Sequence, residues 1–511
     1  MNLIERIDSD VGRLALLDVG ATRAHEAKAL DVAPPVALMA HAGECVARLA
    51  LAIAPHARTI LVFAGPGNNG GDGIEAATRL RGFGKDASVV LVGDPTRRPA
   101  DAAHALERAR AAGVVMRNFD ASGDSGADAP DLVVDALLGI GASRPPEGAL
   151  AAAIECIAGY AASGARVLAV DVPSGFDIDR GQSLGNACVT ANDTLTFISA
   201  KPGLFTGAGR DQAGRVWLAR LGVDVGTGTD ASAFLVGRSD PSCADVPRRQ
   251  TQHKGSFGDV AVVGGDAGMT GAAWLAARAA QAAGAGRVFV DLLGANATHP
   301  VEVDPRHPEL MFRPGWARGD ADVVSRATVV CGCGGGGAVH ELLPRLLSLA
   351  TRLVLDADAL NALAADTSLQ TLLQVRASRG FETILTPHPL EAARLLDSDT
   401  ATVQSDRLRA AHELAERFRV VVVLKGSGTV IAMHGETPRI NATGNASLAS
   451  AGTGDVLSGW IGGRWSAGGT GAFDAATRGV IEHGAAAEPE RAGALRASDL
   501  IEALYRNAAR G

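Results

Sequence analysis

Residues 59–84 read TILVFAGPGNNGGDGIEAATRLRGFG. An apolar, strand-like run (59–64) leads into the glycine-rich segment GPGNNGGDG (65–73), and a helix-like run (74–84) follows. The segment contains G-x-G-x-x-G between a strand and a helix, the context of a dinucleotide site in an α/β sheet. Its centre, however, carries two amides and a carboxylate where a pyrophosphate would sit. The stretch therefore predicts an α/β fold and leaves the ligand open.

The same alternation of apolar runs and helical patterns continues through the first half of the chain. Candidate strands are 59–65, 87–94, 131–139, 166–175 and 193–199, and candidate helices include 99–113 and 149–164. Near-continuous apolar strands separated by helices are typical of a parallel sheet covered on both faces. We expect a Rossmann-like three-layer α/β/α arrangement.

A polar segment broken by Gly and Pro, residues 223–256, interrupts this pattern. The alternation resumes with a candidate helix at 270–286 and candidate strands at 259–266, 287–294, 327–334, 352–361, 382–388 and 420–426. The two halves share an architecture but no repeated motif. The expected domains are 1–222 and 245–511, with a linker region at 223–244.

The composition excludes several classes of protein. Hydrophobic residues make up 47% of the 511 residues and charged residues 20%, which is typical of globular domains. The net charge of −8 argues against a general nucleic-acid binder, and no apolar run approaches the ~20 residues of a membrane span. The six cysteines form no C-x-x-C pair, and the N-terminus lacks the apolar core of a signal peptide. We expect reduced thiols, a cytoplasmic location, and neither nucleic acid nor membrane as partner.

Polar loops follow three predicted strands of the first half, each with a carboxylate: Asp72, Asp135 and Asp171. Carboxyl ends of parallel strands meet at one edge of a sheet, so these acids are expected in one crevice. Backbone amides there favour an anion, whereas the acids and the asparagines suit a hard cation or a proton transfer. The alternative is structural: Asp72 caps the helix at 74–84, and Asp135 and Asp171 cap turns.

The motifs LMAHAGE (38–44), GPGNNGGDG (65–73), VDALLGIG (134–141), DVPSG (171–175) and TFISAKPGLFTG (196–207) together resemble the NAD(P)H-hydrate epimerase domain. The resemblance implies a substrate, NAD(P)H hydrated at C6 of the nicotinamide ring, whose R and S forms are interconverted. It makes Asp171 the candidate acid/base, facing the reacting ring. It implies contacts to the hydrate from Asn68, Asn69, Gly70, Gly71 and Asp72, phosphate contacts from Gly139, Ile140, Gly141, Ala142, Ser143, Arg144 and Pro145, and a potassium ion on Asn69, Asp135 and Ser174.

The strongest motif of the second half is NATGNASLASAGTGDVLSGWIGG (441–463). Gly452-Thr453-Gly454-Asp455 is expected to open a helix, whose free N–H groups bind anions. Beside such a helix end, Asp455 could take a proton from a hydroxyl that exchanges a phosphoryl group. The alternative is a helix-start residue that the helix dipole favours.

Two further motifs follow predicted strands. In VLKGSGTVIAM (423–433), Lys425 and the loop amides could contact a nucleotide, although the segment also fits a plain hairpin with a turn glycine. It is not a Walker A loop. In ILTPHPLEAARLL (384–396), His388 precedes a helix, and a lone histidine is usually structural.

Together with HKGSFGDVAVVGGDAGMTGAA (253–273) and LDADALN (355–361), these motifs resemble the ribokinase-like NAD(P)H-hydrate dehydratase domain. The resemblance implies that ADP, accompanied by magnesium, phosphorylates the C6 hydroxyl and that phosphate then leaves to restore NAD(P)H. It makes Asp455 the substrate-side catalytic acid. It implies hydrate contacts from Ala272, Gly334, His388 and Asp455, and nucleotide contacts from Lys425, Gly426, Ser427, Gly428, Thr429 and Gly454.

The sequence departs from this family pattern at two places. The family's G-P-G-L-G reads GCGGG at residues 332–336, which makes the loop more flexible. The family's P-H-P-G-E reads PHPLE at residues 387–391, which places the bulk of Leu390 near His388.

The leading hypothesis is a bifunctional repair enzyme that binds NAD(P)H hydrates and ADP and forms a homo-oligomer. One alternative is a hydroxymethylpyrimidine-type small-molecule kinase fused to a regulatory, ligand-sensing N-terminal domain. Another is a non-catalytic binding protein. The carboxylates Asp135 and Asp171 favour the enzyme, because a regulatory domain has no need of them.

Overall fold

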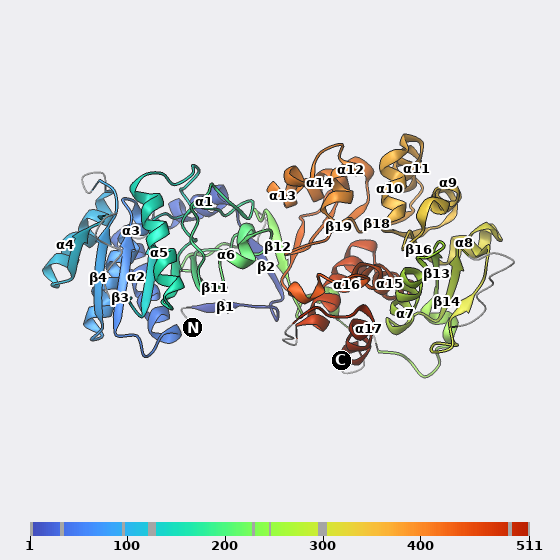
Figure 1. Cartoon of the computed structure of the whole chain (residues 1–511), viewed down its shortest axis with the longest axis horizontal. Coiled ribbons are helices and arrows are strands. Elements are labelled where there is room, and N and C mark those ends of the chain that lie inside the picture. Colours follow the sequence, from blue (N-terminus) through green and yellow to red (C-terminus); the bar gives the residue numbers. More distant parts are fainter. Residues whose placement is uncertain are drawn as a thin grey trace. The chain divides into compact units, whose positions relative to one another are not determined.

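The computed structural model of the chain describes residues 4–30, 35–94, 98–120, 129–226, 230–244, 247–294, 304–488 and 493–508. It divides into two compact units, one made of Met1–Asp8 and Ala15–Ala233 and the other of Ser9–Leu14 and Phe234–Gly511. Each unit is built on its own mostly parallel sheet with helices on both faces (Figure 1). The predicted α/β class with two such sheets is confirmed.

The sheet of the first unit has the order β1-β11-β10-β7-β6-β3-β4-β5 in the described residues. Only β1 runs antiparallel, against β11. The five strands predicted from the sequence are all present, and β1, β5 and β11 complete the sheet. The bounds are β1 (Glu5–Ile7), β3 (Thr59–Ala64), β4 (Asp86–Leu91), β5 (Val115–Asn118), β6 (Leu132–Ala136), β7 (Arg166–Val170), β10 (Asp193–Phe197) and β11 (Arg215–Ala219), with the small hairpin β8 (Phe176–Asp177) and β9 (Gln182–Ser183) outside it.

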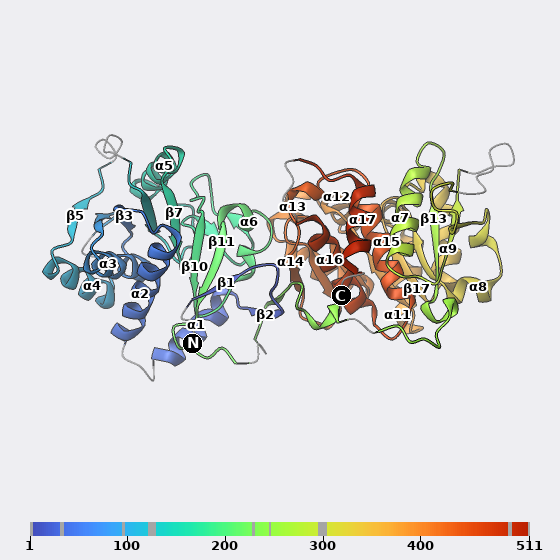
Figure 2. The same cartoon turned by 90° about the horizontal axis from the view of Figure 1, so that it is seen from below.

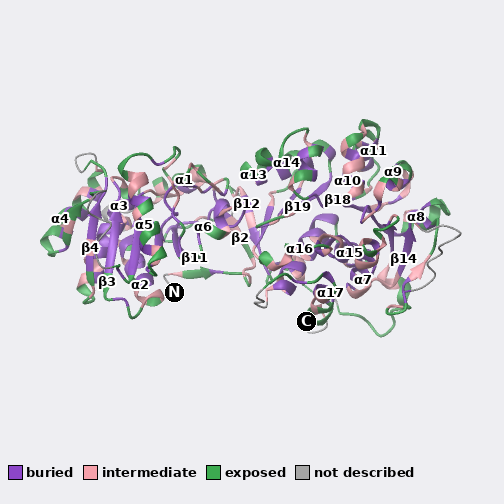
Figure 3. Ribbon diagram, viewed as in Figure 1, coloured by how far each residue is buried: buried purple, intermediate pink, exposed green. Residues whose placement is uncertain are grey.

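Alternate residues of β3 belong to different cores, as period-two side chains require. Ile60 and Val62 pack with helices α2 (Pro35–Ile53), α3 (Asn68–Gly82) and α4 (Ala100–Ala111). Leu61 and Phe63 pack on the other face with α5 (Ala149–Ala162). Figures 2 and 3 show the buried strands between these helices, which confirms the three-layer arrangement. The unit also contains α1 (Val19–Leu30) and α6 (Gly209–Gln212).

Helix α3 begins at Asn68, earlier than the predicted start at Ile74. The segment NNGGD is therefore its first turns and not a loop. Glycine is disfavoured inside a helix, but close packing demands it here: a Cβ at Gly70 would lie 2.1 Å from the carbonyl oxygen of Gly65, and one at Gly73 would lie 2.4 Å from Cβ of Ala136. These glycines let the helix approach β3 and β6.

The sheet of the second unit has the order β15-β14-β13-β16-β17-β18-β19-β20-β21-β12-β2 in the described residues. Its neighbours from β15 to β19 are parallel, and β19, β20 and β21 are joined antiparallel. The bounds are β2 (Arg13–Leu16), β12 (Ala233–Val236), β13 (Asp259–Gly264), β14 (Arg287–Leu292), β15 (Met311–Phe312), β16 (Thr328–Cys331), β17 (Arg352–Leu355), β18 (Glu382–Leu385), β19 (Val421–Leu424), β20 (Val430–Met433) and β21 (Arg439–Asn441).

Helices cover both faces of this second sheet (Figure 1). Val260 and Val262 of β13 pack with α7 (Thr270–Ala282), α15 (Thr453–Ser466) and α16 (Ala472–Ala487). The remaining helices are α8 (Ala321–Arg326), α9 (Val339–Leu349), α10 (Asp358–Ala365), α11 (Thr367–Ser378), α12 (Pro389–Leu395), α13 (Thr400–Ser405), α14 (Arg407–Phe418) and α17 (Ala497–Ala508). The strand predicted over 352–361 ends at Leu355, because the chain turns at Ala357 (φ 47°) and enters α10.

The N-terminal segment Ser9–Leu14 belongs to the second unit. Its Arg13 guanidinium makes two hydrogen bonds of 2.9 Å to the buried carboxylate of Asp240, 227 positions away in the sequence. Among the helices of the described residues, none is long and apolar enough to cross a membrane.

Candidate active sites

A cavity of about 880 Å³ lies at the carboxyl ends of β3, β6, β7 and β10 in the first unit. These strands are neighbours in the sheet, so the predicted convergence of their end loops is observed. Of the predicted site residues, the cavity is lined by Asn68, Asn69, Asp72, Gly139, Ile140, Gly141, Ala142, Ser143, Arg144, Pro145 and Asp171. Gly70 and Gly71 are not part of this lining. They pack instead against the Gly65 carbonyl and the Met39 side chain, respectively.

Asp171 follows β7 in a left-handed conformation (φ 64°) that a non-glycine residue adopts at a cost. Its Oδ1 accepts hydrogen bonds from Lys201 Nζ (2.8 Å), Thr196 Oγ1 (3.3 Å) and the Phe197 backbone N–H (3.3 Å). Within the described residues, Oδ2 of Asp171 accepts no hydrogen bond. Asp171 is one of the residues that line the cavity. Asp171 is thus held by one oxygen, with the other left for a ligand.

Lys201 is fully buried. Besides Asp171, its ammonium donates to Thr196 Oγ1 (2.7 Å) and the Phe197 carbonyl (2.9 Å). A buried ammonium is costly unless it is paired and hydrogen-bonded, and here all three donors are used. The sequence analysis gave Lys201 no role, although it lies in the motif TFISAKPGLFTG.

Asp72 lies on the same cavity wall, inside α3. Burial raises its pKa well above the usual value, and the charges of Asp171 and Glu26 raise it further. The protonated form of Asp72 is therefore favoured more than that of an exposed aspartate. The alternative in which Asp72 caps the helix is wrong, because the N-cap is Gly67 and no side chain caps it.

Asp135, at the end of β6, and Ser174 form a buried pair, and neither is among the residues that line the cavity. Ser174 donates from Oγ (2.6 Å) and from its backbone N–H (2.8 Å) to the carboxylate, which also receives the Leu137 N–H (3.2 Å) and so ties the turn after β6. Burial raises the pKa of Asp135 to about 6. No lysine or arginine of the described residues pairs with this carboxylate.

Asn69 is buried, and neither atom of its side-chain amide has a hydrogen-bond partner among the residues that the structure describes. A buried amide without partners is costly and calls for an explanation. Its side chain lies beside Gly139, where a Cβ would come within 3.2 to 3.4 Å of it. The unpaired amide oxygen of Asn69, the buried carboxylate of Asp135 and the hydroxyl of Ser174 are oxygen groups of the kind that bind a hard cation.

Arg23 and Arg144 line the same cavity. A Cβ at Gly141 would lie 3.1 Å from Nη2 of Arg23, so this guanidinium sits against the loop at 139–145. Burial raises the pKa of Glu26, and the charge of Asp171 raises it further against the opposing effect of Lys201 and Arg23. The cavity therefore combines cationic groups at that loop with acids around Asp171. Arg23 and Glu26 belong to no motif, and the sequence analysis missed both.

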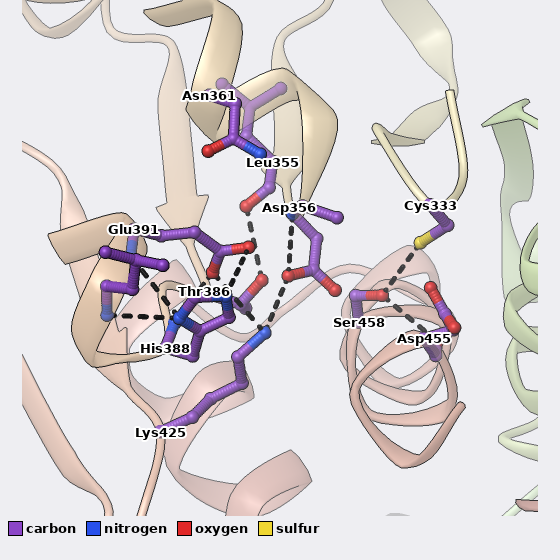
Figure 4. Close-up of polar contacts among 12 residues, drawn as sticks. Cys333, Leu355, Asp356, Asn361, Thr386, His388, Glu391, Lys425, Asp455 and Ser458 are labelled. Carbon is purple, nitrogen blue, oxygen red and sulfur yellow. Dashed lines mark hydrogen bonds and ion pairs between the residues drawn. The ribbon is translucent and has the colours of Figure 1, made fainter. Parts of the chain in front are cut away.

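In the second unit, a polar cluster lies at the carboxyl ends of four neighbouring strands, β16 to β19 (Figure 4). Lys425 Nζ lies 2.8 Å from Oδ1 of Asp356 and 3.9 Å from Oε2 of Glu391. These two carboxylates raise the pKa of Lys425 against the opposing effect of burial. Asp356 lies in the LDADALN motif, but the sequence analysis assigned it no role.

The other side of the cluster is the first turn of α15. Gly452 is the N-cap in a left-handed conformation (φ 87°), with no side-chain cap. A Cβ at Gly454 would lie 3.5 Å from Lys425 Nζ, which places the ammonium beside the helix N-terminus. Burial raises the pKa of Asp455 to about 6, and the charge of Asp356 contributes. The helix-start position of Asp455 is thus observed, together with an environment suited to proton transfer near neutral pH.

His388 has the structural role that the sequence left open. It is the N-cap of α12, where Nδ1 accepts the N–H groups of Leu390 (3.1 Å) and Glu391 (3.3 Å). Glu391 returns the contact by accepting the His388 N–H (2.7 Å). Burial and the nearby Lys425 lower the pKa of His388. The side chain of Leu390 is exposed.

The remaining predicted residues fall into two places. Gly334, in a left-handed conformation (φ 57°), lies against Ala272, since a Cβ there would come within 2.9 Å of that side chain. Residues 425–429 form the connection of the antiparallel pair β19 and β20, as the hairpin alternative describes. Lys425 at its start nevertheless reaches the cluster.

Comparisons with known proteins place each unit. A family described as YjeF-related protein N-terminus matches residues 36–203, and one described as NAD(P)H-hydrate dehydratase matches residues 260–506. A bifunctional NAD(P)H-hydrate repair enzyme of Escherichia coli is 36% identical over 479 residues, covering 92% of this chain and 88% of its own. One from Coxiella burnetii is 38% identical over 445 residues, covering 83% and 84%.

A solved structure of an ADP/ATP-dependent NAD(P)H-hydrate dehydratase from Bacillus subtilis, co-crystallised with ATP/Mg2+, is 28% identical. It covers 53% of this chain and 95% of its own, with a TM-score of 0.42.

Proposed function

The chain belongs to the bifunctional NAD(P)H-hydrate repair enzymes, and we propose that its two units carry the two activities at separate sites. It epimerises the R and S hydrates of NAD(P)H and dehydrates the S hydrate at the expense of ADP. The proposed epimerase domain is 1–222, the connection 223–244, and the dehydratase domain 245–511. The observation that carries the proposal is that each matched region holds a site with the chemistry its reaction needs. A lone kinase or a non-catalytic binding protein would not need both sites.

The epimerase site fits a ligand with phosphates at one end and a reacting ring at the other. We assign the phosphates to Arg23, Arg144 and the backbone of 139–145, and the ring to the acids around Asp171. Inversion at C6 requires a bond of that carbon to break and re-form, with a proton moved at the hydroxyl oxygen. Oδ2 of Asp171 is free to accept that proton, and protonated Asp72 is able to donate one.

Lys201 positions Asp171 for this step. Its ammonium and the Thr196 hydroxyl both hold Oδ1, so the carboxylate cannot turn its free oxygen away from the cavity. Asn69, Asp135 and Ser174 fit a potassium ion, because the amide is otherwise unpaired and the carboxylate lacks a cationic partner. When bound, the ion supplies a fixed positive charge at the edge of the substrate pocket.

At the dehydratase site we assign proton acceptance to Asp455. The C6 hydroxyl loses its proton to this carboxylate as its oxygen attacks the terminal phosphoryl group of ADP, and AMP leaves. The C6–O bond then breaks with phosphate as leaving group, and loss of a proton from the neighbouring ring carbon restores the double bond. Phosphate is a far better leaving group than hydroxide, which explains the use of a phosphoryl donor.

The phosphoryl oxygens would meet Lys425 and the free N–H groups of α15, which lie side by side. The loop 426–429 and Gly454 are proposed to complete the nucleotide site, and Ala272, Gly334 and the His388 turn to border the hydrate. Magnesium fits here, because it commonly binds one or two carboxylates together with nucleotide phosphates. When bound, it neutralises phosphate charge.

Two variants test the separation of sites. Asp455→Asn is expected to stop recovery of NAD(P)H while R and S hydrates still exchange. Asp171→Asn is expected to consume the S hydrate with ADP and leave the R hydrate behind, after correction for spontaneous exchange measured without enzyme. Loss of the same single activity in both variants would refute two separate sites.

A further inference from the structure

The dehydratase cluster contains a mixed set of sulfur and oxygen atoms, of which the proposed reaction uses the Asp455 carboxylate and leaves the Cys333 thiol without a role. Sγ of Cys333 and carboxylate oxygens of Asp356 and Asp455 lie within 4.8 Å of one another. They come from three separate elements: the loop after β16, the end of β17 and the first turn of α15. Figure 4 shows Cys333 and Asp356 on either side of the helix end that carries Asp455.

The backbone around Cys333 is held in place. Gly332 (φ 116°) and Gly334 (φ 57°) flank it in conformations that favour glycine. A Cβ at Gly332 would lie 1.9 Å from the Asp356 carbonyl oxygen, so the two loops are in direct contact. The Cys333 carbonyl also accepts the Gly265 N–H at 2.9 Å. The thiol is therefore fixed beside the two carboxylates.

Each side chain of the set keeps an atom available to a ligand. Asp356 accepts its hydrogen bonds from Lys425 Nζ (2.8 Å) and the Ala357 N–H (3.0 Å) through Oδ1 alone. Its Oδ2 accepts none within the described residues. Sγ of Cys333 lies 3.2 Å from the hydroxyl of Ser458 and also hydrogen-bonds to the Asp455 side chain, so its neighbours are neutral or anionic oxygen atoms. Cys333 and Asp356 are buried, whereas Asp455 is only half-buried.

We propose that Cys333, Asp356 and Asp455 bind a thiophilic divalent cation, of the zinc, cobalt or cadmium class, and that binding switches the dehydratase site off. Zinc takes sulfur and carboxylate oxygen together, with water in the remaining position. Magnesium takes oxygen ligands and not sulfur, so the Cys333 sulfur selects for a thiophilic cation, which would compete with magnesium for carboxylates of the same cluster. On binding, the S–H bond of Cys333 breaks, the sulfur–metal bond forms, and the proton passes to solvent.

Inhibition follows from the ligand set and rests on the proposed function. A metal-bound carboxylate of Asp455 can no longer accept the proton of the C6 hydroxyl. The cation also places positive charge beside Lys425 and competes for the space that the substrate would take. Epimerisation, which uses the residues of the first unit, is expected to be unaffected.

Cobalt titration of the full chain tests the binding directly. The probe is CoCl₂, whose bond to a thiolate gives a charge-transfer band in the near ultraviolet. Cys331→Ala is the matched control, because Cys331 is also fully buried and lies two positions away in β16, outside the cluster. Wild type and Cys331→Ala are expected to show the band, saturating at one cobalt per chain and displaced by zinc. Cys333→Ala is expected to lose it.

A band that survives in Cys333→Ala, or is absent from folded wild type, would overturn the site. The activity arm adds ZnCl₂ to the hydrate assay. Wild type should lose ADP-dependent recovery of NAD(P)H when zinc is added and regain it with a zinc-selective chelator that spares magnesium. Cys333→Ala should have the same activity with and without zinc. Equal zinc inhibition of both would refute the switch. Failure of ADP-dependent recovery in wild type assayed with magnesium and without zinc would instead refute the proposed function, on which the cobalt band does not depend.

Discussion

Lys201 and Asp171 form a buried ion pair in which Nζ lies 2.8 Å from Oδ1 of the carboxylate. The pair joins residues 30 positions apart at the ends of neighbouring strands, and Thr196 bridges it by contacting both partners. Two further donors share the same oxygen, so within the described residues the other oxygen of this cavity-lining carboxylate has no donor. This arrangement explains how Asp171, in a strained backbone conformation, can hold one carboxylate oxygen in a fixed position as a proton acceptor.

Breaking this pair should lower the rate of epimerisation strongly and the affinity for the substrate only slightly. Lys201→Met leaves the Asp171 charge without its partner, which costs about 3–5 kcal/mol of stability for a buried pair. We expect kcat for R/S exchange to fall by about 10²–10⁴-fold with a small change in KM. Epimer exchange followed by chromatography of the hydrates measures this.

A second, milder variant is needed as a control in case Lys201→Met does not fold. Thr196→Val removes the hydroxyl that donates to Oδ1 of Asp171 and accepts from Lys201, but it keeps the ion pair, so a smaller loss of kcat than in Lys201→Met is expected. Full epimerase activity in both folded variants would contradict the positioning role of this oxygen.

The dehydratase should lose activity as the pH falls through about 6. Asp455 must be ionised to accept a proton, and burial raises its pKa to about 6. The rate of ADP-dependent recovery is therefore expected to rise with pH up to that region and then to level off. A rate of ADP-dependent recovery that is constant from pH 5 to pH 8 would show that Asp455 is not the base. Epimerisation measured in the same samples shows whether the chain remains folded.

Potassium should stabilise the first unit most above pH 6. Burial raises the folded-state pKa of Asp135 to about 6, above the ordinary value near 3.9 that the unfolded chain retains. In potassium-free buffer this group therefore lowers the free energy of unfolding as pH rises between those values, by roughly 3 kcal/mol in all. A bound cation offsets this loss.

Thermal unfolding in potassium chloride against tetramethylammonium chloride measures this effect. We expect the rise in Tm to be larger at pH 8 than at pH 5, where Asp135 is protonated. Asp135→Asn should abolish the difference between the two pH values. An equal rise in wild type and variant would show that potassium acts elsewhere.

Lys425→Met should weaken nucleotide binding. The ammonium lies beside the N-terminus of α15, where a phosphoryl group would meet both. We expect KM for ADP to rise by about 10–100-fold, which corresponds to the about 1.5–3 kcal/mol of a hydrogen bond to a charged group. Steady-state kinetics at saturating hydrate measures it. An unchanged KM for ADP would place the phosphates elsewhere, and epimerisation is the internal control.

The sequence predicted the fold class and the strands that carry the sites, because apolar periodicity reports burial directly. It also predicted that Asp72, Asp135 and Asp171 share one crevice: Asp72 and Asp171 line the cavity, whereas Asp135 lies inside β6 and is not among the residues that line it. It misplaced the start of α3, because the glycines of NNGGD disfavour a helix by propensity. The packing of Gly70 and Gly73 against Gly65 and Ala136 decides otherwise.

The residues that the sequence missed act through partners from other segments. Lys201 gains its role from Asp171, Arg23 from the loop at Gly141, and Asp356 from Lys425, 69 positions away. Periodicity and spacing cannot reveal such pairs. The partnerless amide of Asn69 likewise becomes visible only once its surroundings are known.

The most direct test of the account is the fate of a mixture of R and S hydrates of NADH incubated with the pure protein, with and without ADP and magnesium. With ADP, we predict complete loss of both hydrates and stoichiometric recovery of NADH absorbance. Without ADP, the hydrates should only exchange. Two results would contradict the assignment of both activities to this chain. One is recovery of NADH that does not depend on ADP. The other is remaining R hydrate that disappears no faster than by spontaneous exchange.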